Sequence, residues 1–433
     1  MQKQTQSFSI TNFTKTKQQL LHWANQFSSC SFLDSHHYKH AYNEIECIVG
    51  VGALQFFSPS NNEEKAAFHH FLANSNDWLF GHIAYNYTQL LYPSIQNNYT
   101  DNIGFAPILF FQPAIVVQLY QNKLVIESYT ENPIEIFTTI QETSIQTSIS
   151  TKSIQLQPKI SKENYLKSIE QLQQHIVRGD CYEINFCQEF FSSSAVINPV
   201  DVYEHLTEIS PNPFACFYRQ EHQYLLCASP ERYLKKTNET LVSQPIKGTF
   251  KRNLTNKQED EILKQELYQN HKERSENVMV VDLVRNDLSK ICKEGSVEVE
   301  ELFGIYSFPQ VHQMISTIKG KVLPTTNFMD MIDATFPMGS MTGAPKKRVI
   351  ELINEFEKSN RGLYSGAVGY ISPNRDFDFN VVIRSLLYNS TTQYLSYQVG
   401  SGITFNSVAV HEYEECLLKA SAMVEVLKAT IVE

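Results

Sequence analysis

The feature that most constrains the fold is a succession of short, strand-like apolar segments that alternate with helices in no regular order. Residues 114–120 and 123–129 are two such segments with only a turn between them, which predicts a β-hairpin. Residues 162–177 follow a capping serine and repeat apolar side chains at helical spacing. Because the regular strand–helix–strand rhythm of a doubly wound sheet is missing, we expect an α+β fold of antiparallel β-sheets flanked by helices.

The order of these segments also predicts how the chain is divided. Short β-type runs dominate residues 45–130, and a tract rich in serine, threonine and glutamine follows at 131–159 as an edge strand or a connection. We therefore place a boundary near residue 155, between an N-terminal region at 1–150 and a second region at 155–430. In the second region the patterns predict a long helical region at about 257–293, a strand at 379–388 and a closing helix at 410–429.

Charge and composition exclude several classes of function. The chain has 36 lysine and arginine residues against 46 acidic ones, a net charge of −10, which repels a nucleic-acid backbone. No apolar stretch approaches the roughly 18 residues of a membrane span and no secretory signal pattern is seen, so we expect a cytoplasmic protein with no membrane partner. The eight cysteines are scattered without metal-binding spacing, which predicts reduced thiols.

Two acidic pairs are candidates for a metal site. Glu273 and Glu276 are three residues apart in one expected helix, and Glu412 and Glu415 have the same spacing in another, so each pair lies on one helix face. Carboxylates from two helices that meet at a cleft suit Mg²⁺, which takes one or two protein carboxylates and completes its shell with water and a substrate anion. The alternative is two solvated helix faces with ordinary ion pairs.

A lysine and a glutamate are candidates for covalent chemistry. Lys247, in the segment PIKGT, could act as a nucleophile if its amine is neutral, and otherwise is an exposed lysine at a strand end. Glu231 follows a Ser-Pro turn and could act as a general acid or simply cap that turn.

A glycine-bearing loop and a lone arginine point to an anionic ligand. The loop FPMGSMTGAPKKR places Ser340 and Gly343 before a proline that can start a helix, and its backbone N–H groups suit a carboxylate or a phosphate. The GxxxxGK(S/T) spacing of a Walker nucleotide-binding loop does not occur, so the support for nucleotide binding is weak. Arg384 lies on a segment expected to be a buried strand, which predicts a bidentate carboxylate partner from a ligand or from the protein.

Together these segments resemble the family of chorismate-utilising enzymes, which includes component I of aminodeoxychorismate synthase and of anthranilate synthase. The matching blocks run in order as GDCYEINF, SPER, PIKGTFKR, ENVMVVDLVRND, ELF, FPQVHQMIST, PMGSMTGAPK, RGLYSGAVGY, VIRSLLY, VGSGI and HEYEE, across about residues 160 to 430. The N-terminal region matches more loosely, through LFGHIAYNY. The resemblance implies that 1–150 is an anthranilate synthase component I-like region and that 155–430 is the chorismate-binding catalytic domain.

Within this family the residue before the glycine of the PIxGT block is diagnostic. Aminodeoxychorismate synthases have lysine there and anthranilate synthases have alanine, so Lys247 points to 4-amino-4-deoxychorismate, the precursor of 4-aminobenzoate and folate. Isochorismate and salicylate synthases have a water-activating lysine in the block that here reads YEINF. This chain has Glu183 at that position, a departure from the glutamine that is usual in the ammonia-using synthases.

The resemblance also implies roles for individual residues. Glu276 and Glu415 would hold Mg²⁺, the expected cofactor, with Glu412 and Glu273 nearby. Lys247 would add to C2 of chorismate while Glu231 assists departure of the C4 hydroxyl, and His312 matches an active-site histidine. The residues that would bind the substrate are Ser340, Thr342, Gly343, Ala344, Tyr364, Arg384, Gly400 and Gly402.

The expected partners and the competing functions follow from the same resemblance. The chain has no GxCxG block of a glutamine amidotransferase, so a separate glutaminase subunit would supply the ammonia. The nearest alternative is anthranilate synthase component I, whose tryptophan-regulated members have an LLES-like element that FLDS at 32–35 matches only faintly. A non-catalytic chorismate-binding subunit is the other alternative. Retention of the lysine, arginine and carboxylates argues against it.

Overall fold

The computed structural model describes residues 3–38, 45–145 and 153–432. The helices are α1 (Phe13–Ala24), α2 (Asn62–Asn74), α3 (Thr88–Leu91), α4 (Pro133–Glu142), α5 (Lys162–Val177), α6 (Pro199–Ile209), α7 (Lys257–Gln269), α8 (His271–Ser289), α9 (Phe328–Thr335), α10 (Lys346–Phe356) and α11 (Ala409–Leu427), with short 3₁₀ turns η1 (Tyr85–Tyr87) and η2 (Gly339–Met341). The strands are β1 (Gln4–Ser9), β2 (Ser29–Asp34), β3 (Cys47–Phe57), β4 (Leu79–Ile83), β5 (Ile108–Leu119), β6 (Lys123–Ser128), β7 (Gln155–Pro158), β8 (Glu183–Ser192), β9 (Phe214–Gln220), β10 (Gln223–Ser229), β11 (Arg232–Thr237), β12 (Thr240–Gln244), β13 (Ile246–Lys251), β14 (Glu298–Ser307), β15 (Val311–Lys321), β16 (Gly343–Ala344), β17 (Ala367–Ile371), β18 (Phe377–Asn380), β19 (Ser385–Asn389), β20 (Tyr394–Ile403) and β21 (Thr430–Ile431).

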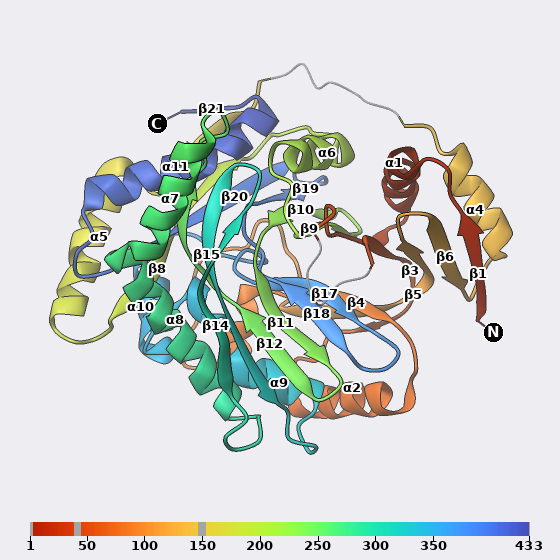
Figure 1. The fold of residues 1–433 in the computed structure, drawn as a ribbon, viewed down its shortest axis with the longest axis horizontal. Helices are drawn as coiled ribbons and strands as arrows, with labels where there is room; N and C mark the ends of the chain where they lie inside the picture. The colour runs from red at the N-terminus through yellow and green to blue at the C-terminus, as the bar shows by residue number, and fades with distance from the viewer. Residues whose placement is uncertain (1–2, 39–44, 146–152, 433) are drawn as a thin grey trace.

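The strands form a mostly antiparallel sheet system that branches at its N-terminal part (Figure 1). One branch runs through β8, β20, β19, β10 and β9 to β2. The other runs from β4 through β17, β18, β11 and β12 to β15. Strands β3 and β5 connect the two, since β3 pairs with β2 and β5 pairs with both β3 and β4. The expected α+β architecture is confirmed.

Hydrogen bonding crosses the boundary that we place near residue 155. Strand β2 pairs with β9 and strand β4 pairs with β17, so N-terminal strands complete sheets built largely from the second region. The two regions are therefore joined through the sheet as well as through the chain, and the boundary itself stays a prediction.

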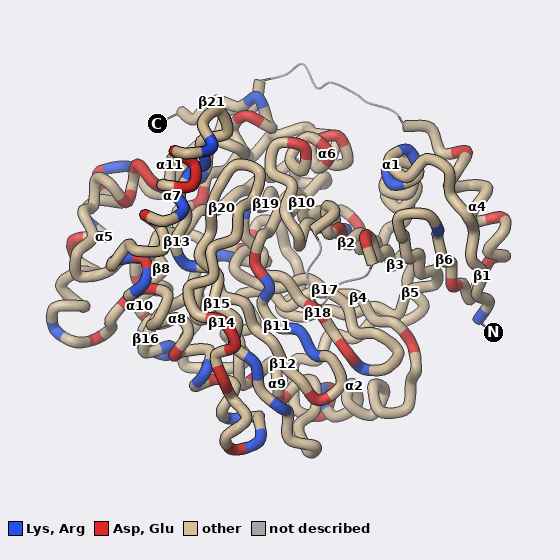
Figure 2. The backbone as a smooth tube through the Cα atoms, in the orientation of Figure 1, with Lys and Arg blue, Asp and Glu red and all other residues tan. Residues whose placement is uncertain are grey.

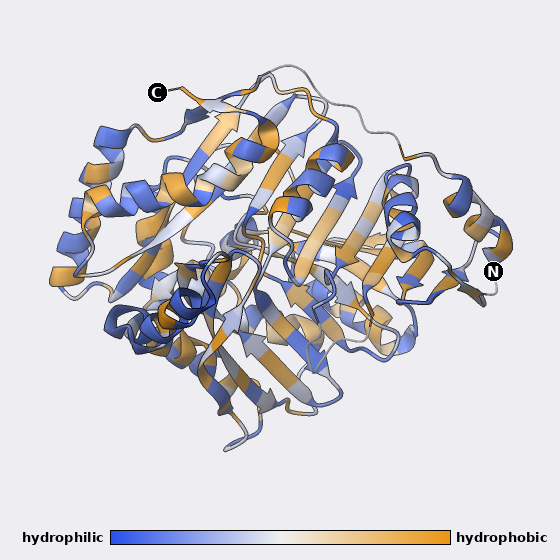
Figure 3. Ribbon diagram, turned by 45° about the horizontal axis from the view of Figure 1, so that its top comes forward, coloured by the Kyte–Doolittle hydropathy of each residue, from blue (hydrophilic) through white to orange (hydrophobic). Residues whose placement is uncertain are grey.

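Helices cover the sheets and enclose two hydrophobic cores (Figure 3). In one core, Tyr165 of α5 and Tyr413 of α11 lie with their ring centroids 5.3 Å apart, beside Phe186 of β8. In the other, Phe68 of α2 stacks on Phe110 of β5 at 5.4 Å. Apolar burial of this kind is the main force that fixes helices to sheets. Charged residues are spread over helices, strands and loops (Figure 2).

Several local predictions are confirmed. Strands β5 and β6 form the expected hairpin, α5 begins after the Ser161 cap, and α11 closes the fold. All eight cysteines are free thiols, as expected.

No helix in the described ranges is long and apolar enough to cross a bilayer.

The helical region expected at 257–293 is confirmed and consists of two helices, α7 and α8, because Asn270 adopts an extended conformation and its side chain caps α8 through the backbone N–H of Glu273. Two other local predictions are wrong. The strand expected at 379–388 is divided into β18 and β19, and Arg384 lies between them with a φ of 49°. The tract at 131–159 contains the helix α4, which Asn132 caps; its residues 146–152 lie outside the described residues.

The close pairing of β17 with β18 depends on a glycine. A Cβ at Gly369 would overlap the carbonyl oxygen of Asp378 on the neighbouring strand. We predict that Gly369→Ala lowers the free energy of unfolding by about 3 kcal/mol, because the backbone of the pair cannot move aside. Urea-induced unfolding measures the change.

A glycine in open space supplies the control. Gly179 has a φ of 85°, and a Cβ added there would have no atom of the described chain within 4 Å. Gly179→Ala should therefore lower the free energy of unfolding only by the strain of a left-handed backbone, about 1 kcal/mol. Equal effects of the two substitutions would contradict the packing argument.

Candidate functional site

Lys247 lies at the centre of the site. It belongs to β13, and its ammonium contacts Oε1 of Glu183 on β8 and lies 3.9 Å from Oε2 of Glu276 on α8. The side chain is 13% exposed, so this lysine is not the solvated residue of the alternative interpretation. Burial by itself lowers the pKa of Lys247, but the carboxylates of Glu183 and Glu276 outweigh it, and the net shift of the pKa is upward. The resting side chain is therefore a charged ammonium.

Two glycines make room for this contact. A Cβ at Gly402 of β20 would lie 2.8 Å from Nζ of Lys247 and 2.9 Å from Oε1 of Glu183. Gly248, directly after the lysine, has a φ of 97° and would place a Cβ 3.1 Å from Oε2 of Glu273. Larger residues at these positions would fill the space that the lysine and its carboxylates share.

The four predicted carboxylates gather around one further lysine. Lys272 experiences the charges of all four, and they raise its pKa against the opposing effect of burial. Those carboxylates are Glu273 and Glu276 of α8 and Glu412 and Glu415 of α11. The structure therefore brings together the two acidic pairs that the sequence places far apart.

The carboxylates differ in their partners. Oε1 of Glu276 is buried without a hydrogen bond from any described residue, and burial raises the pKa of this carboxyl to about 7. Glu415 forms an ion pair with Lys419 at 2.7 Å, and this partner lowers its pKa although burial acts the other way. Glu412 accepts a hydrogen bond from Ser401. Of the four carboxylates, Glu276 is thus the one with a buried oxygen that accepts no hydrogen bond from the described residues.

These residues fit a magnesium ion that is completed by other ligands. Mg²⁺ binds oxygen and commonly uses one or two protein carboxylates together with water and a substrate anion. The unpartnered oxygen of Glu276 meets that requirement. Among the described residues, no group of three or more His, Cys, Asp or Glu side chains is arranged to hold a metal by itself. A magnesium ion at Glu276 would therefore need further ligands from water or a bound anion, and its binding stays a prediction.

Glu231 and Ser340 form a second part of the site. Oγ of Ser340, in the glycine loop, donates a hydrogen bond of 2.7 Å to Oε1 of Glu231, which is 3% exposed. Burial raises the pKa of Glu231 to about 7, although Ser340, Lys247 and Arg384 oppose the shift. A carboxyl with this pKa is partly protonated at neutral pH and can donate a proton.

Arg384 is a largely buried cation, and among the described residues none forms an ion pair with it. Its position before β19 is an irregular turn rather than the expected strand, with the left-handed φ given above. Among the described residues its guanidinium forms no ion pair and no hydrogen bond, and Glu231 acts on it only through its charge. Burial lowers its pKa to about 10. A desolvated guanidinium of this kind favours an anionic ligand, so the predicted carboxylate partner is not supplied by the described protein.

The remaining loop residues are held by backbone contacts. Thr342 donates its hydroxyl to the carbonyl of Met338 at 2.9 Å, and its own carbonyl accepts from the N–H of Asn185 on β8. Gly343 and Ala344 form β16, which pairs with the first residues of β8. The predicted loop thus lies against Glu183. Its role in binding a carboxylate stays a prediction.

The other predicted substrate residues flank the same strands. Gly400 and Gly402 lie in β20 opposite Cys187 and Asn185 of β8. Tyr364 is buried next to Cys187, and burial raises the pKa of its hydroxyl. Their contacts with a ligand stay predictions.

His312 is oriented by other residues. Its Nδ1 lies 2.8 Å from Oγ of Ser307, and its Nε2 lies 3.0 Å from Oδ1 of Asp260 on α7. Within the described ranges, neither Lys247 nor Glu231 is in contact with this ring. Its catalytic role stays a prediction.

One buried pair near the site is absent from the sequence predictions. Arg361 is 1% exposed and forms an ion pair of 2.6 Å with Glu357, four residues earlier. Arg361 also donates to the carbonyl oxygens of Met341 and Asn185. The only signal in the sequence is the spacing of a glutamate and an arginine, which ordinary surface ion pairs share.

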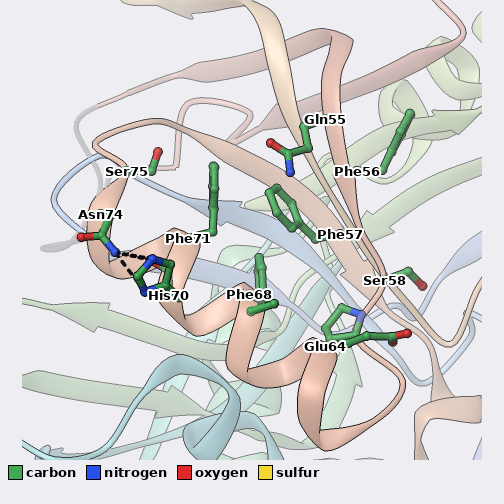
Figure 4. Close-up of a pocket in the computed structure, with 12 residues that line it drawn as sticks. Gln55, Phe56, Phe57, Ser58, Glu64, Phe68, His70, Phe71, Asn74 and Ser75 are labelled. Carbon is green, nitrogen blue, oxygen red and sulfur yellow. Dashed lines mark hydrogen bonds between the residues drawn. The ribbon is translucent and has the colours of Figure 1, made fainter.

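Two of the cavities outside this site are relevant to the sequence predictions. One of about 60 Å³ is lined by Asp34 and Ser35 of the FLDS segment, and its Asp34 carboxylate is already paired with Lys17 at 2.6 Å. Binding of tryptophan at this segment stays a prediction. The other, of about 620 Å³, lies between β3 and α2 among Phe57, Phe71 and other side chains, and contains no predicted site residue (Figure 4).

The sequence is similar to a known family. The model of the chorismate binding enzyme family matches residues 16–425. Aminodeoxychorismate synthase component 1 of Bacillus subtilis (strain 168) is 37% identical over 268 residues, which cover 62% of this chain and 56% of that protein. The protein of the same name from Escherichia coli (strain K12) is 35% identical over 272 residues, 63% of this chain and 59% of that protein. The chain thus spans little more than half the length of these relatives.

Solved structures share the fold. Anthranilate synthase component I from Streptococcus pneumoniae TIGR4 aligns with a TM-score of 0.76 at 24% identity, covering 89% of this chain and 93% of that one. The menaquinone-specific isochorismate synthase from Escherichia coli aligns with a TM-score of 0.79 at 15% identity, covering 98% and 95%. At these identities the likeness supports the architecture alone.

The raised pKa of Glu231 predicts a pH-dependent stability. The folded state keeps this proton up to about pH 7, whereas an unfolded glutamic acid loses it near pH 4.5, so the folded state loses stability as pH rises between these values. We predict that Glu231→Gln removes this contribution, on the order of 3 kcal/mol, because glutamine cannot ionise and still accepts from Ser340.

Urea unfolding from pH 4 to 8 measures the effect. The mutant should gain stability relative to wild type toward pH 8 and none near pH 4. A difference that is constant with pH would show that Glu231 has an ordinary pKa.

Proposed function

Because the chain belongs to the chorismate binding enzyme family, we propose that it is component I of an aminodeoxychorismate synthase, which converts chorismate and ammonia to 4-amino-4-deoxychorismate. The observation that carries the proposal is Lys247, a buried lysine in the PIKGT segment that shares its site with Glu231 and with an unpaired arginine. Curated relatives with this name are 37% and 35% identical to the chain. In their pathway the product is converted to 4-aminobenzoate, the folate precursor.

In the first half of the reaction, Lys247 forms a bond from Nζ to C2 of the chorismate ring. The ring electrons shift, the bond from C4 to its hydroxyl breaks, and Glu231 donates the proton with which the hydroxyl leaves as water. The raised pKa of Glu231 supports this acid role. Lys247 must first lose a proton, and the carboxylate of Glu183, with which it is in contact, is the nearest acceptor.

In the second half, ammonia forms a bond to C4 and the lysine leaves with the electron pair of its bond to C2. The new ammonium group at C4 loses a proton to Glu231, which returns Glu231 to its protonated form. Two allylic displacements thereby replace one difficult displacement of a poor leaving group. The ammonia comes from a glutamine amidotransferase subunit, the partner that the designation component 1 of the relatives supports.

Binding of the substrate depends on charge. Chorismate has two carboxylates, and Arg384 offers one of them an unpaired guanidinium in a desolvated position. Tyr364 and the backbone near Gly400 and Gly402 complete that part of the site. A Mg²⁺ ion held by Glu276 and Glu415, with Glu412 beside them, would neutralise the ring carboxylate and fix its orientation. Ser340 and residues 342–344 line the same end.

Anthranilate synthase component I is the second candidate. Anthranilate synthase component 1 of Acetivibrio thermocellus is 34% identical over 269 residues, 62% of this chain and 54% of that protein. Lys247 favours the aminodeoxychorismate reaction, since it provides a nucleophile that alanine lacks. We also propose a cytoplasmic location, supported by eight cysteines that are all free thiols.

Product analysis tests the proposal. The purified chain is incubated with chorismate, Mg²⁺ and ammonium at mildly alkaline pH, and the products are separated by chromatography with and without an added aminodeoxychorismate lyase. We expect a product that the lyase converts to 4-aminobenzoate. Formation of anthranilate or isochorismate would overturn the proposed reaction.

The role of the lysine is tested by Lys247→Ala. We predict a loss of at least about 10³-fold in kcat under ammonia-saturated conditions, because the covalent route requires the amine. Lys251→Ala, an exposed lysine on the same strand, is the matched control and should retain full activity. A fully active Lys247→Ala enzyme would rule out the nucleophile.

A further inference from the structure

Glu183 is held firmly in place by its backbone. It is 2% exposed and begins β8, where Ala344 pairs with it on one side and Ile184 pairs with Ile403 on the other. A Cβ at Gly343 would overlap its carbonyl oxygen, so the two backbones are in direct contact. The side chain therefore projects from a rigid edge, which is what a positioning role requires.

Two carboxylates compete for the ammonium of Lys247. Glu183 is in direct contact through Oε1, whereas Oε2 of Glu276 lies 3.9 Å away, beyond hydrogen-bond distance. Because Coulomb attraction falls with separation, the nearer carboxylate controls where the lysine lies. If Glu183 offered no acceptor, a small rotation of the lysine would bring Nζ onto Glu276.

Glu276 has two lysines near it in this arrangement but forms no hydrogen bond with either. Within the described chain its Oε1 has no hydrogen bond, and Lys272, the lysine that faces that oxygen, is 3.9 Å away and half-exposed. Neither Lys247 nor Lys272 thus engages Glu276 at hydrogen-bond distance. This is the state that a carboxylate needs if it is to bind a divalent cation, because a lysine bound to it would have to be displaced first.

We propose that Glu183 is a positioning residue that holds Lys247 apart from Glu276 and so keeps the Glu276 carboxylate available to Mg²⁺. The inference rests on the proposed function, in which Glu276 is a magnesium ligand. It assigns to Glu183 a task that depends on its acceptor oxygen rather than on its negative charge. Glutamine at this position can perform that task, and alanine cannot.

The first experiment measures Mg²⁺ binding to the chorismate-free protein by isothermal titration calorimetry. Glu183→Ala should weaken the affinity at least about tenfold, because Lys247 moves onto Glu276. Glu183→Gln should stay within about threefold of wild type, since its amide oxygen still accepts from the lysine. Glu189→Gln, a buried carboxylate further along β8, is the control and should leave Mg²⁺ affinity unchanged.

A double substitution separates positioning from loss of structure. In Glu183→Ala with Lys247→Ala the competing ammonium is gone, so Mg²⁺ affinity should return to the wild-type value or exceed it. Failure of the double variant to recover, with thermal unfolding unchanged, would overturn the proposal. So would a Glu183→Ala protein that binds Mg²⁺ as tightly as wild type.

Kinetics supply an independent readout. At saturating Mg²⁺, Glu183→Ala should lose at least about tenfold in kcat with the KM for chorismate within about threefold, because the lysine is misaligned while the substrate site is intact. Glu183→Gln should keep the KM but not restore the kcat, because its amide oxygen accepts a hydrogen bond from Lys247 but cannot take its proton. A change confined to KM would contradict a role in placing the lysine.

The binding experiment also distinguishes this inference from the function on which it rests. If Lys247→Ala retains full synthase activity, the nucleophile is refuted, but Mg²⁺ binding by the single and double variants still tests whether Glu183 restrains the lysine. If the affinities show no dependence on Glu183 while Lys247→Ala is inactive, the function stands and the positioning role falls.

Discussion

The buried guanidinium of Arg361 joins the parts of the chain that form the site. It pairs with Glu357 at the end of α10 and donates to the carbonyl oxygens of Met341 in the glycine loop and Asn185 in β8. Glu357 in turn accepts from the backbone N–H of Cys187 on the same strand. A buried charge that loses its partner costs several kcal/mol, so loop, strand and helix are fixed relative to one another as one unit.

That unit determines the electrostatics of the site. With β8 and the loop fixed, Glu183 faces Lys247, Glu276 keeps an unpartnered oxygen, and Arg384 has no anionic partner within the described chain. An acidic protein of net charge −10 thereby presents two largely buried cations, Lys247 and Arg384, on either side of Glu231. For a dianionic substrate the local arrangement of charge matters more than the net charge, since field lines concentrate in a cleft of low dielectric.

Local signals in the sequence predicted local structure well. The hairpin of β5 and β6 and the helices α5 and α11 follow from spacing and caps that lie within each segment. The break at Asn270 did not follow, because residues 269–277 are all polar and no apolar pattern marks where one helix ends and the next begins. The turn at Arg384 did not follow either, because apolar residues flank it on both sides. The pairing of the two acidic helix faces was expected from carboxylate chemistry, yet which oxygens stay free depends on partners such as Ser401 and Lys419.

The sequence by itself determined which chemistry the chain carries: a lysine in PIKGT, two i, i+3 carboxylate pairs, and a glycine loop, each readable because its residues are neighbours. Only the tertiary structure decided which of these charged groups are in contact with one another. Glu183 and Lys247 are 64 residues apart, and their contact exists because β8 and β13 approach the same space beside Gly402. Contacts between distant segments depend on the packing of the whole sheet, and no local pattern records them.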